Sequence, residues 1–589
     1  MNILGISAYY HDSAAALFKD GQLVAAAEEE RFTRKKHDAG FPRHAAQYCL
    51  DQAGIQVKDL DYVGFYEKPL IKFERLLYTY FATFPSGYRA FLRSMPVWLK
   101  DKLWIPGKIR RELGGYTGPL LFSDHHESHA ASAFLVSPFE SAAILTLDGV
   151  GEWSTTTYGR GAGNQVELLD EIRFPHSLGL LYTAFTYYLG FRVNSAEYKV
   201  MGLAPYGKPT YLDQIRQIAQ LREDGSFWLD LRYFNFHTGL TMTNRAFDRL
   251  FGGPPRPTEE KLSQRHFDLA ASVQKFLEEV VLKMGEHVHQ RTGEKNLCMA
   301  GGVALNCVAN GRLLREGPFE QIFIQPAAGD AGGAIGVAAL IWNSVLGNPR
   351  TFTWPHAYWG PEYKDEDVLK VLEQAKVPFQ RYGRKELLET TARLIAEQNV
   401  VGWFQGRMEF GPRALGNRSI LADARNPANK DVVNLKIKFR ESFRPFAPAV
   451  LAERAGEYFD IDRESPYMLL TAQVRENKRV IPAVTHLDGS ARLQTVTRAE
   501  NALFYDLIAE FDRQTGVPVI INTSYNVRGE PIILSPEDAF RCFMRTKMDA
   551  LVMHDCVVLK RDVAEEAEIA RQEVEAFAKQ DEGQELVTV

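Results

Sequence analysis

The chain has 589 residues, of which 45% are hydrophobic, and it carries 69 Lys and Arg residues against 74 Asp and Glu residues. This length is too great for one hydrophobic core, so we expect two or three domains. The formal net charge of −5 gives no basic excess, which argues against nucleic acid as a partner.

The amino-terminal residues 1–7 lead directly into a strand-like pattern, so we expect no signal peptide. No apolar run approaches the roughly 20 residues that a membrane span requires, and we expect no membrane partner. The five cysteines are scattered and odd in number, which is typical of a reducing compartment. The sequence therefore predicts a cytoplasmic protein.

Three strand-like runs open the chain, at residues 3–7, 13–18 and 22–27, and turn residues separate them. A helix with proline in its first turn is predicted for residues 42–53, and a strand for residues 61–66. The next segment, residues 70–111, is rich in aromatic and basic side chains. It predicts an inserted helical subdomain that packs its aromatic residues. A wall of an acceptor-substrate pocket is the alternative.

Two histidines stand four residues apart where a strand ending at residue 122 gives way to a helix of small apolar residues. His125 and His129 would share one face of the helix's first turn, where two imidazoles can bind one metal ion. Surface or capping histidines produce the same spacing, so the pair alone leaves metal binding open. His126, between the two, is predicted to be a bystander.

A second strand group begins at residues 142–148 and repeats the arrangement of strand, polar-glycine turn and strand. A long amphipathic helix is predicted for residues 267–291, with strands at 296–300 and 321–325 and an apolar helix ending near residue 342. Two halves that each contain a hairpin and helices indicate a duplicated actin-like ATPase architecture.

The composition changes at residues 347–361, which are rich in Pro, Trp and Tyr, and we place a domain boundary there. The predicted organisation is a first domain at residues 1–350, a second α/β domain at residues 363–560 and a charged helical tail at residues 561–589.

Two aspartates stand at the ends of predicted elements. Asp148 closes an apolar strand and precedes Gly149 and Gly151, and Asp330 lies between glycines before a helix. A buried carboxylate is costly unless it meets a cation or hydrogen-bond donors. Both are therefore candidate ligands of a metal or of a magnesium–phosphate group. Capping of the next element is the alternative for each.

Two glycine turns, at residues 300–306 and 329–336, each lead into a helix. Glycine lets backbone amides approach a phosphate, and a helix N-terminus favours negative charge. Neither turn is a Walker loop or a Rossmann fingerprint, and tight helix–strand packing is the alternative. Together the turns favour nucleotide binding by Gly149, Gly151, Gly301, Gly302, Asn306, Gly329 and Gly332.

The second domain holds a dense set of cations in segments 406–419, 436–445, 490–495 and 522–530. Arginine and lysine among glycine, serine and asparagine suit a small phosphorylated ligand. Salt-bridged surface helices are the alternative for the lysines. The candidate pocket residues are Arg413, Arg418, Lys438, Arg444, Arg492, Asn522, Ser524 and Arg528.

Several motifs resemble the NodU/CmcH family of O-carbamoyltransferases, from the first strand to about residue 560. They are Gly-Ile-Ser-Ala-Tyr-Tyr-His-Asp at residues 5–12, Glu-Glu-Glu-Arg-Phe-Thr-Arg-Lys-Lys-His at 28–37, Glu-Tyr-Lys-Val-Met-Gly-Leu-Ala-Pro-Tyr-Gly at 197–207, and the segments 406–419 and 522–530. The resemblance implies an α/β fold in which a Kae-type, duplicated actin-like domain precedes a YrdC-like domain.

The resemblance also implies a two-step reaction. The YrdC-like domain would form carbamoyl-adenylate from carbamoyl phosphate and Mg-ATP, and the Kae-type domain would transfer the carbamoyl group to a hydroxyl of a small molecule, such as a sugar-like compound or an intermediate of antibiotic biosynthesis. Arg413, Lys438, Arg444, Arg492, Ser524 and Arg528 match that family's carbamoyl-phosphate and ATP pocket. A homodimer is compatible with this architecture.

Further residues are carried over from the family motifs. His125, His129, Asp148 and Asp330 match metal ligands that hold iron(II) in relatives, although manganese or zinc would also suit this ligand set. His11 and Lys36 match residues near the carbamoyl-adenylate. We expect His11 to act as the base and Lys36 to stabilise negative charge. Lys199 and Gly202, in the motif at residues 197–207, complete the predicted nucleotide site.

Other functions remain open. An actin-like sugar kinase or ATPase would explain the first domain and leave the cations of the second without a role. A tRNA threonylcarbamoyl transferase fits less well, because the chain lacks a basic face and carries a fused second domain. A nucleotide- or sugar-sensing protein without catalysis is the non-enzymatic alternative.

Overall fold

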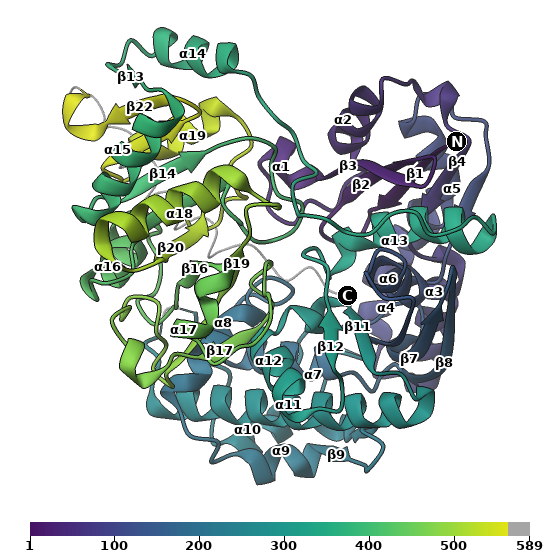
Figure 1. Ribbon diagram of the computed structural model, residues 1–589. Helices are drawn as coiled ribbons and strands as arrows, with labels where there is room; N and C mark the ends of the chain where they lie inside the picture. The colour runs from purple at the N-terminus through teal and green to yellow at the C-terminus, as the bar shows by residue number, and fades with distance from the viewer. Residues whose placement is uncertain (259, 564–589) are drawn as a thin grey trace. The chain divides into compact units, whose positions relative to one another are not determined.

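The computed structural model describes residues 1–258 and 260–563 (Figure 1). Among these residues the chain forms two compact units. Unit 1 comprises Met1–Glu29 and His37–Trp354, and unit 2 comprises Glu30–Lys36 and the chain from Pro355 onward. The predicted charged tail lies outside the described residues from residue 564 on. Within the described residues, no helix is both long and apolar enough to cross a membrane.

The first sheet of unit 1 contains the strands predicted near the amino terminus. Its members are β1 (Asn2–Ser7), β2 (Ala14–Lys19), β3 (Gln22–Glu28), β4 (Tyr62–Phe65) and β5 (Leu120–Phe122). They lie in the order β3-β2-β1-β4-β5. The three strands β1, β2 and β3 form an antiparallel meander, and β4 and β5 continue parallel to β1.

The second sheet of unit 1 repeats this topology. Its strands are β6 (Ser141–Leu147), β7 (Ser154–Ala162), β8 (Gln165–Arg173), β11 (Asn296–Ala300) and β12 (Gln321–Phe323). Their order is β12-β11-β6-β7-β8, again with an antiparallel meander followed by two parallel strands. The similar strand groups in the sequence thus form two sheets of one topology.

Two buried helices connect the two sheets of unit 1, as Figure 1 shows. Helix α13 (Gly333–Leu340) packs on β1, β2 and helix α6 (His125–Phe134), and α6 packs on β6 and β11. Glycine permits this close approach, because a Cβ atom at Gly5 would lie 1.9 Å from the Ala334 carbonyl oxygen, and one at Gly336 would lie 1.9 Å from the Ser128 carbonyl oxygen. The amino-terminal ends of both helices carry candidate site residues.

The remaining helices of unit 1 surround the sheets and include most of those predicted. The predicted helix at residues 42–53 is α2 (Arg43–Ala53), and the long amphipathic helix is α11 (Gln264–Thr292). The others of seven or more residues are α3 (Pro69–Thr83), α4 (Tyr88–Lys100), α5 (Ile105–Glu112), α7 (Leu178–Tyr188), α8 (Glu197–Leu203), α9 (Leu212–Ile218), α10 (Arg245–Phe251) and α12 (Cys307–Glu316).

The inserted segment at residues 70–111 is helical, as predicted, but only some of its aromatic residues pack against the protein. Phe73 and Trp98 stack with ring centroids 5.7 Å apart. Phe81 and Phe84, in contrast, are 76% and 77% exposed. The helices α3 and α4 each bury only one face, so side chains on their other faces have no protein to pack against.

Unit 2 is built on one mixed sheet with the strand order β13-β22-β21-β14-β15-β20-β16-β19. Helices α15 (Arg384–Ala396) and α18 (Ala502–Thr515) cover one face around the buried Trp403. Helices α14 (Asp365–Gln374) and α19 (Pro536–Arg545) contribute to the core on the other face. The strands are β13 (Gln380–Arg381), β14 (Val401–Phe404), β15 (Arg418–Asp423), β16 (Ala447–Leu451), β19 (Gln494–Val496), β20 (Val519–Ser524), β21 (Ala550–Met553) and β22 (Cys556–Leu559).

A short amino-terminal segment belongs to unit 2 despite its distance in sequence. Arg31 donates a hydrogen bond to the Gly411 carbonyl at 2.9 Å, and Arg34 donates to the Ile532 and Pro531 carbonyls at 2.6 and 3.0 Å. These bonds attach residues 30–36, which include Lys36, to the second unit.

Replacement of Gly336 by alanine tests the close contact of the helices. Gly336→Ala forces a Cβ against a backbone oxygen that cannot rotate away, so we expect a loss of about 1–3 kcal/mol of stability and a lower melting temperature by circular dichroism. Gly107→Ala is the matched control in unit 1, since no atom lies within 4 Å of a Cβ at that position. Equal melting temperatures for the two variants would contradict the packing described here.

Candidate functional site

Four side chains in unit 1 form a candidate metal centre. His125 and His129 come from the first turn of α6, Asp148 directly follows β6, and Asp330 precedes α13. One ligand atom from each lies within 4.8 Å of the others. His125 Nε2 is 3.2 Å from Asp148 Oδ2, and His129 Nε2 is 3.6 Å from Asp330 Oδ1. Residues far apart in sequence therefore present two nitrogens and two carboxylates to one point.

The local sequence fixes the amino-terminal end of α6. Asp124 and Glu127 form a capping box, in which each side chain accepts a hydrogen bond from the other residue's backbone. The Glu152 carboxylate accepts hydrogen bonds from the His125 amide at 3.0 Å and the Lys68 amide at 2.7 Å. The first turn that bears His125 is thus held by two acidic partners.

The buried polar atoms of this cluster fit a bound cation. Both carboxylate oxygens of Asp330, both ring nitrogens of His129 and Nδ1 of His125 are buried without a hydrogen-bond partner. Buried polar atoms are nearly always satisfied in native proteins, and a cation would satisfy several of these at once. Two imidazoles and two carboxylates suit a divalent iron, manganese or zinc ion.

The charges of the cluster also indicate a place for a cation. Burial acts to lower the pKa of His125, but Asp330 and Asp148 outweigh it and raise the pKa to about 9. The two carboxylates thus hold a proton on an imidazole when no other cation is near. A metal would displace that proton, because only the neutral imidazole can be a ligand. His126 lies outside the cluster, with Nδ1 2.6 Å from Thr146 Oγ1, and its burial lowers its pKa to about 3.

His11 lies beside this cluster and has its own orienting partner. Its Nδ1 is 2.9 Å from Asp12 Oδ2, and its Nε2 is 3.7 Å from Asp330 Oδ2. Asp12 also contacts His37 Nδ1 at 2.7 Å. Burial opposes protonation, but Asp330 and Asp12 raise the pKa of His11 to about 10. Asp12 was not predicted as a site residue, because the sequence there indicates only a turn; its adjacency to His11 was the available signal.

The predicted nucleotide glycines have two kinds of environment. Space is open at Gly149, and the Gly302 amide donates to Asp148 Oδ1 at 2.9 Å, so both adjoin the candidate metal centre. Gly301 and Gly332 instead pack against backbone, because a Cβ at either would lie 2.2 Å from a carbonyl oxygen. Gly329 is also open, with only Leu305 near its Cβ position at 3.9 Å.

Four other predicted nucleotide residues lie against protein or within a helix. Asn306 caps α12 through the Ala309 amide, at 3.1 Å. Lys199 and Gly202 lie in α8, where the Lys199 ammonium stands 5.3 Å from the Phe191 ring centroid. A Cβ at Gly151 would lie 3.0 Å from the His125 Cβ.

In unit 2 several predicted pocket residues lie near Lys438. Its buried Nζ donates to the Ser524 carbonyl at 2.5 Å and to Asn526 Oδ1 at 2.6 Å, and the Arg528 amide bonds the Lys438 carbonyl at 3.2 Å. Burial lowers the pKa of Lys438 well below its usual value, and the charges of Arg440, Arg444 and Lys36 lower it further. Lys36 is therefore part of this cationic group in unit 2.

The other predicted pocket residues are held by the protein to different degrees. Arg418 is fully buried, donates a hydrogen bond to the Gln405 carbonyl at 2.5 Å and lies over the Phe404 ring at 3.8 Å. These contacts give Arg418 a role in the packing of unit 2. Asn522 donates to Gln494 Oε1 at 2.7 Å. Arg413 is half-buried in the turn before β15, and Arg492 ends the short strand β18 (Ser490–Arg492).

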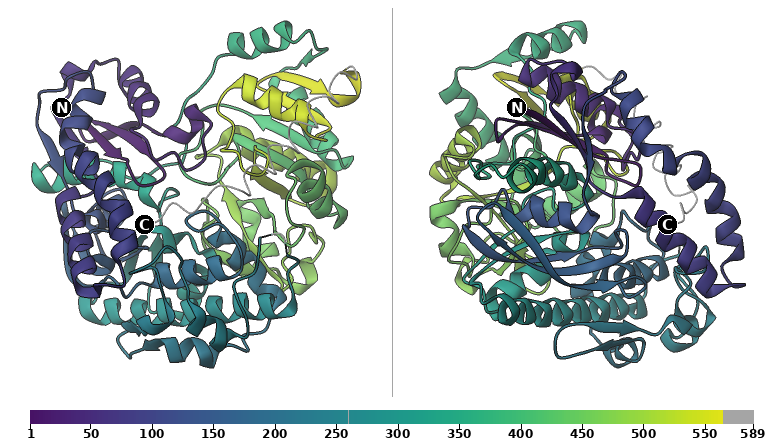
Figure 2. Two further views of the ribbon diagram at one scale, coloured as in Figure 1. Left: turned by 180° about the vertical axis from the view of Figure 1, so that it is seen from behind. Right: turned by 90° about the vertical axis from the view of Figure 1, so that its right-hand side faces the viewer.

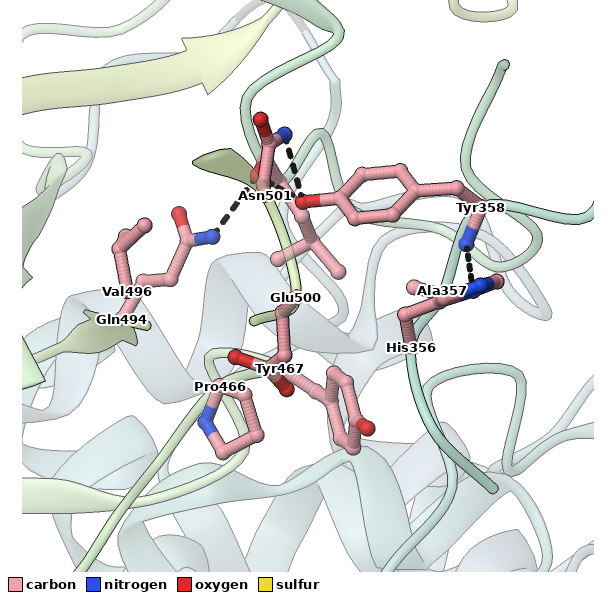
Figure 3. Close-up of a pocket in the computed structure, with 10 residues that line it drawn as sticks. His356, Ala357, Tyr358, Pro466, Tyr467, Gln494, Val496, Glu500 and Asn501 are labelled. Carbon is pink, nitrogen blue, oxygen red and sulfur yellow. Dashed lines mark hydrogen bonds between the residues drawn. The ribbon is translucent and has the colours of Figure 1, made fainter. Parts of the chain in front are cut away.

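A small pocket with a cavity volume of about 10 Å³, room for roughly one water molecule, lies in unit 2 (Figure 3). Gln494 lines it and bonds to Asn522, two residues before Ser524 on β20, so pocket and cations share one side of the sheet. Burial raises the pKa of Glu500, another lining residue, to about 7. No pattern in the sequence predicted this pocket. Its lining residues are His356, Ala357, Tyr358, Leu415, Pro466, Tyr467, Gln494, Val496, Glu500 and Asn501.

The sequence matches two family models that together span most of the chain. The model described as Carbamoyltransferase N-terminus matches residues 2–340, and the model described as Carbamoyltransferase C-terminus matches residues 392–560. The chain therefore belongs to the carbamoyltransferase family, as the motifs predicted, and is a transferase enzyme.

Several curated proteins are similar over nearly the whole chain. The uncharacterized protein sll1178 of Synechocystis is 55% identical, over 95% of this chain and 97% of its own length. Nodulation protein NolNO of Sinorhizobium fredii is 41% identical, over 95% of this chain and 80% of its own length. Nodulation protein U of Rhizobium tropici is 30% identical, over 92% and 93%.

Metal affinity should rise with pH between about 6 and 9. His125 has a pKa of about 9 when no metal is bound, so a metal competes with a proton throughout this window. Each displaced proton makes the affinity climb roughly tenfold per pH unit. Competition of manganese(II) with a chelator, measured at several pH values, gives this slope.

Proton release on manganese addition, read with a pH indicator in weak buffer, is the complementary measurement. Asp330→Asn is the control and should bind little metal by elemental analysis. An affinity that does not change across the window would show that His125 is not a ligand.

Proposed function

We propose that this enzyme is an ATP-dependent O-carbamoyltransferase that works through carbamoyl-adenylate. In the first step water attacks carbamoyl phosphate and gives phosphate and carbamate, and the carbamate oxygen then attacks the α-phosphorus of ATP and displaces pyrophosphate. In the second step the hydroxyl oxygen of a small molecule attacks the carbamoyl carbon and releases AMP. The observation that carries this proposal is that one carbamoyltransferase chain contains both a cationic group around Lys438 and a two-His, two-Asp cluster.

The unit 2 group supports the first step. Arg440, Arg444 and Lys36 are close enough to Lys438 for their charges to lower its pKa, so a phosphate among these cations would relieve their mutual repulsion. Arginine binds phosphate oxygens in pairs and lysine acts as a point charge. We therefore assign carbamoyl phosphate and ATP to this unit.

The unit 1 cluster supports the second step. His125, His129, Asp148 and Asp330 would hold a divalent metal, iron(II) by family analogy, which supplies positive charge for the phosphate of the adenylate. Space is open beside Gly149, which directly follows Asp148, and this leaves backbone next to the cluster accessible to a ligand.

His11 is the proposed base for the acceptor hydroxyl. Asp12 fixes Nδ1, which leaves Nε2 directed toward the Asp330 side of the cluster. The raised pKa of His11 depends on these nearby carboxylates, and a cation bound to them would lower it toward the range in which a histidine accepts protons.

The strand topology supports the finer architecture. Two sheets with the same order and directions in unit 1 agree with a Kae-type, duplicated actin-like domain, and the mixed sheet of unit 2 with its cationic group agrees with a YrdC-like domain. A kinase or ATPase that used unit 1 alone would leave the buried Lys438 group without a role.

Replacement of Lys438 should stop the first step. Lys438→Gln removes the central cation, so pyrophosphate release from ATP and carbamoyl phosphate should fall at least about a hundredfold, of the order of a lost transition-state contact. Lys436→Gln is the matched control, because Lys436 is exposed on the same helical turn. If Lys438→Gln kept the rate of pyrophosphate release, the assignment of this group to adenylate formation would fail.

Replacement of His11 should separate the two steps. His11→Asn keeps a polar side chain but loses the base, so labelled carbamoyl transfer to an acceptor should fall about 10²- to 10⁴-fold, while pyrophosphate release without acceptor persists. The exposed His44→Asn serves as a control. Mass spectrometry of products made with labelled carbamoyl phosphate, ATP and candidate hydroxyl compounds reads out the transfer. Equal loss of both steps would overturn this division.

A further inference from the structure

The helices inserted between β4 and β5 carry most of the exposed apolar side chains of the described residues. Sixteen large apolar side chains are exposed among the described residues, and nine of them lie between residues 70 and 104. Their exposed fractions run from 49% for Val97 to 77% for Phe84. Such a concentration on a folded protein marks an interaction site. The nine are Leu70, Tyr78, Phe81, Phe84, Tyr88, Leu92, Val97, Leu99 and Trp104.

Helix α4 divides its surface into three sectors. At 100° per residue, the exposed Tyr88, Leu92, Pro96 and Leu99 fall within an arc of roughly 80°. The exposed Arg89, Arg93 and Lys100 fall in the next arc of roughly 40°. The remaining sector is the one that packs inward, through Met95 and Trp98. Figure 2 draws α3 and α4 on the outside of unit 1.

The charge of this insertion differs from that of the whole chain. Residues 70–111 contain nine Lys and Arg residues against two acidic residues, whereas the chain has a net charge of −5. Lys72 and Arg75 point inward, where Lys72 pairs with Glu67 and Arg75 donates to the Gly151 carbonyl. The basic residues of α4 are exposed beside the apolar stripe and need a partner that is both apolar and negatively charged.

A second copy of the same face is a poor partner. In a symmetric dimer this patch would meet itself, so one interface would collect the cations of both copies with few acidic side chains to pair with them. Nucleic acid is equally poor, because it offers no apolar interior to Phe81, Phe84 and Leu92. An anionic lipid bilayer offers both properties, with acyl chains beneath a layer of phosphates.

We propose that the α3–α4 face binds the surface of an anionic lipid bilayer. Phe81, Phe84 and Leu92 would enter the boundary between headgroups and acyl chains, and Arg89 and Arg93 would meet lipid phosphates. Trp104, whose indole N–H is already bonded to the Leu99 carbonyl at 2.9 Å, presents its ring at the interface, where tryptophan is favoured. The absence of a spanning segment in the sequence does not bear on this, because a helix that lies in the interface needs none.

Vesicle flotation of the full chain tests the proposal. We expect the protein to float with vesicles that contain about one-third phosphatidylglycerol, and not with vesicles of phosphatidylcholine alone, and the binding to weaken as salt increases. Phe81→Ser/Phe84→Ser and Arg89→Glu/Arg93→Glu should each lower the partition coefficient about tenfold or more, given about 1 kcal/mol per basic residue near an anionic surface. All four side chains are exposed, so these variants should fold.

Matched controls carry the same kinds of change elsewhere. Leu487→Ser removes an apolar side chain that is 68% exposed, and Lys370→Glu/Lys385→Glu reverses two exposed charges. These should float as the unchanged protein does.

Two results would overturn the proposal. One is the absence of flotation with anionic vesicles, or equal flotation of the patch variants and the unchanged protein. The other is a dimer in sedimentation velocity that Phe81→Ser/Phe84→Ser converts to monomer, without vesicle binding, since that would make the face a self-association interface.

Discussion

The contact between α6 and α13 is the constraint on which the candidate metal centre depends. Each helix starts at the edge of a different sheet of unit 1, and glycines bring them within backbone contact. That contact brings Asp330, ahead of α13, to His125 and His129 in the first turn of α6, and β6 ends at the same place with Asp148. No single segment contains the site, because its residues come together only where the helices that follow the two sheets contact each other.

The chain contains two buried charge clusters of opposite sign, one in each unit. In unit 1, Asp148 and Asp330 are buried carboxylates that hold protons on nearby imidazoles. In unit 2, Lys438 is a buried amine surrounded by other cations. Each arrangement is unfavourable without a ligand of opposite charge, since desolvated like charges repel strongly. A bound cation would relieve the first arrangement, and a bound anion would relieve the second.

Much of the fold could be predicted from the sequence. The strand meander in residues 2–28, the long helix α11 and the strand β11 follow directly from periodicity and turn residues. The ligand set could be proposed because Asp148 and Asp330 stand at element ends, where side chains from distant segments converge. Features that depend on tertiary contacts could not be predicted from the sequence. Arg418 is a residue type that commonly binds phosphate, yet its side chain is fully buried and donates hydrogen bonds to carbonyl groups.

The segment at residues 28–37 shows most clearly why sequence position and site membership differ. Arg31 and Arg34 bind backbone carbonyls of unit 2, so Lys36 adds its charge near Lys438. The next residue, His37, belongs to unit 1 and contacts Asp12, which also contacts His11. Lys36, which belongs to the cationic group, is thus followed directly in the sequence by His37, which contacts Asp12, the hydrogen-bond partner of His11. The predicted domains were contiguous stretches of sequence, so they could not place residues 30–36 in unit 2. Long-range hydrogen bonds of Arg31 and Arg34 attach this segment to unit 2, and no local pattern in the segment indicates them.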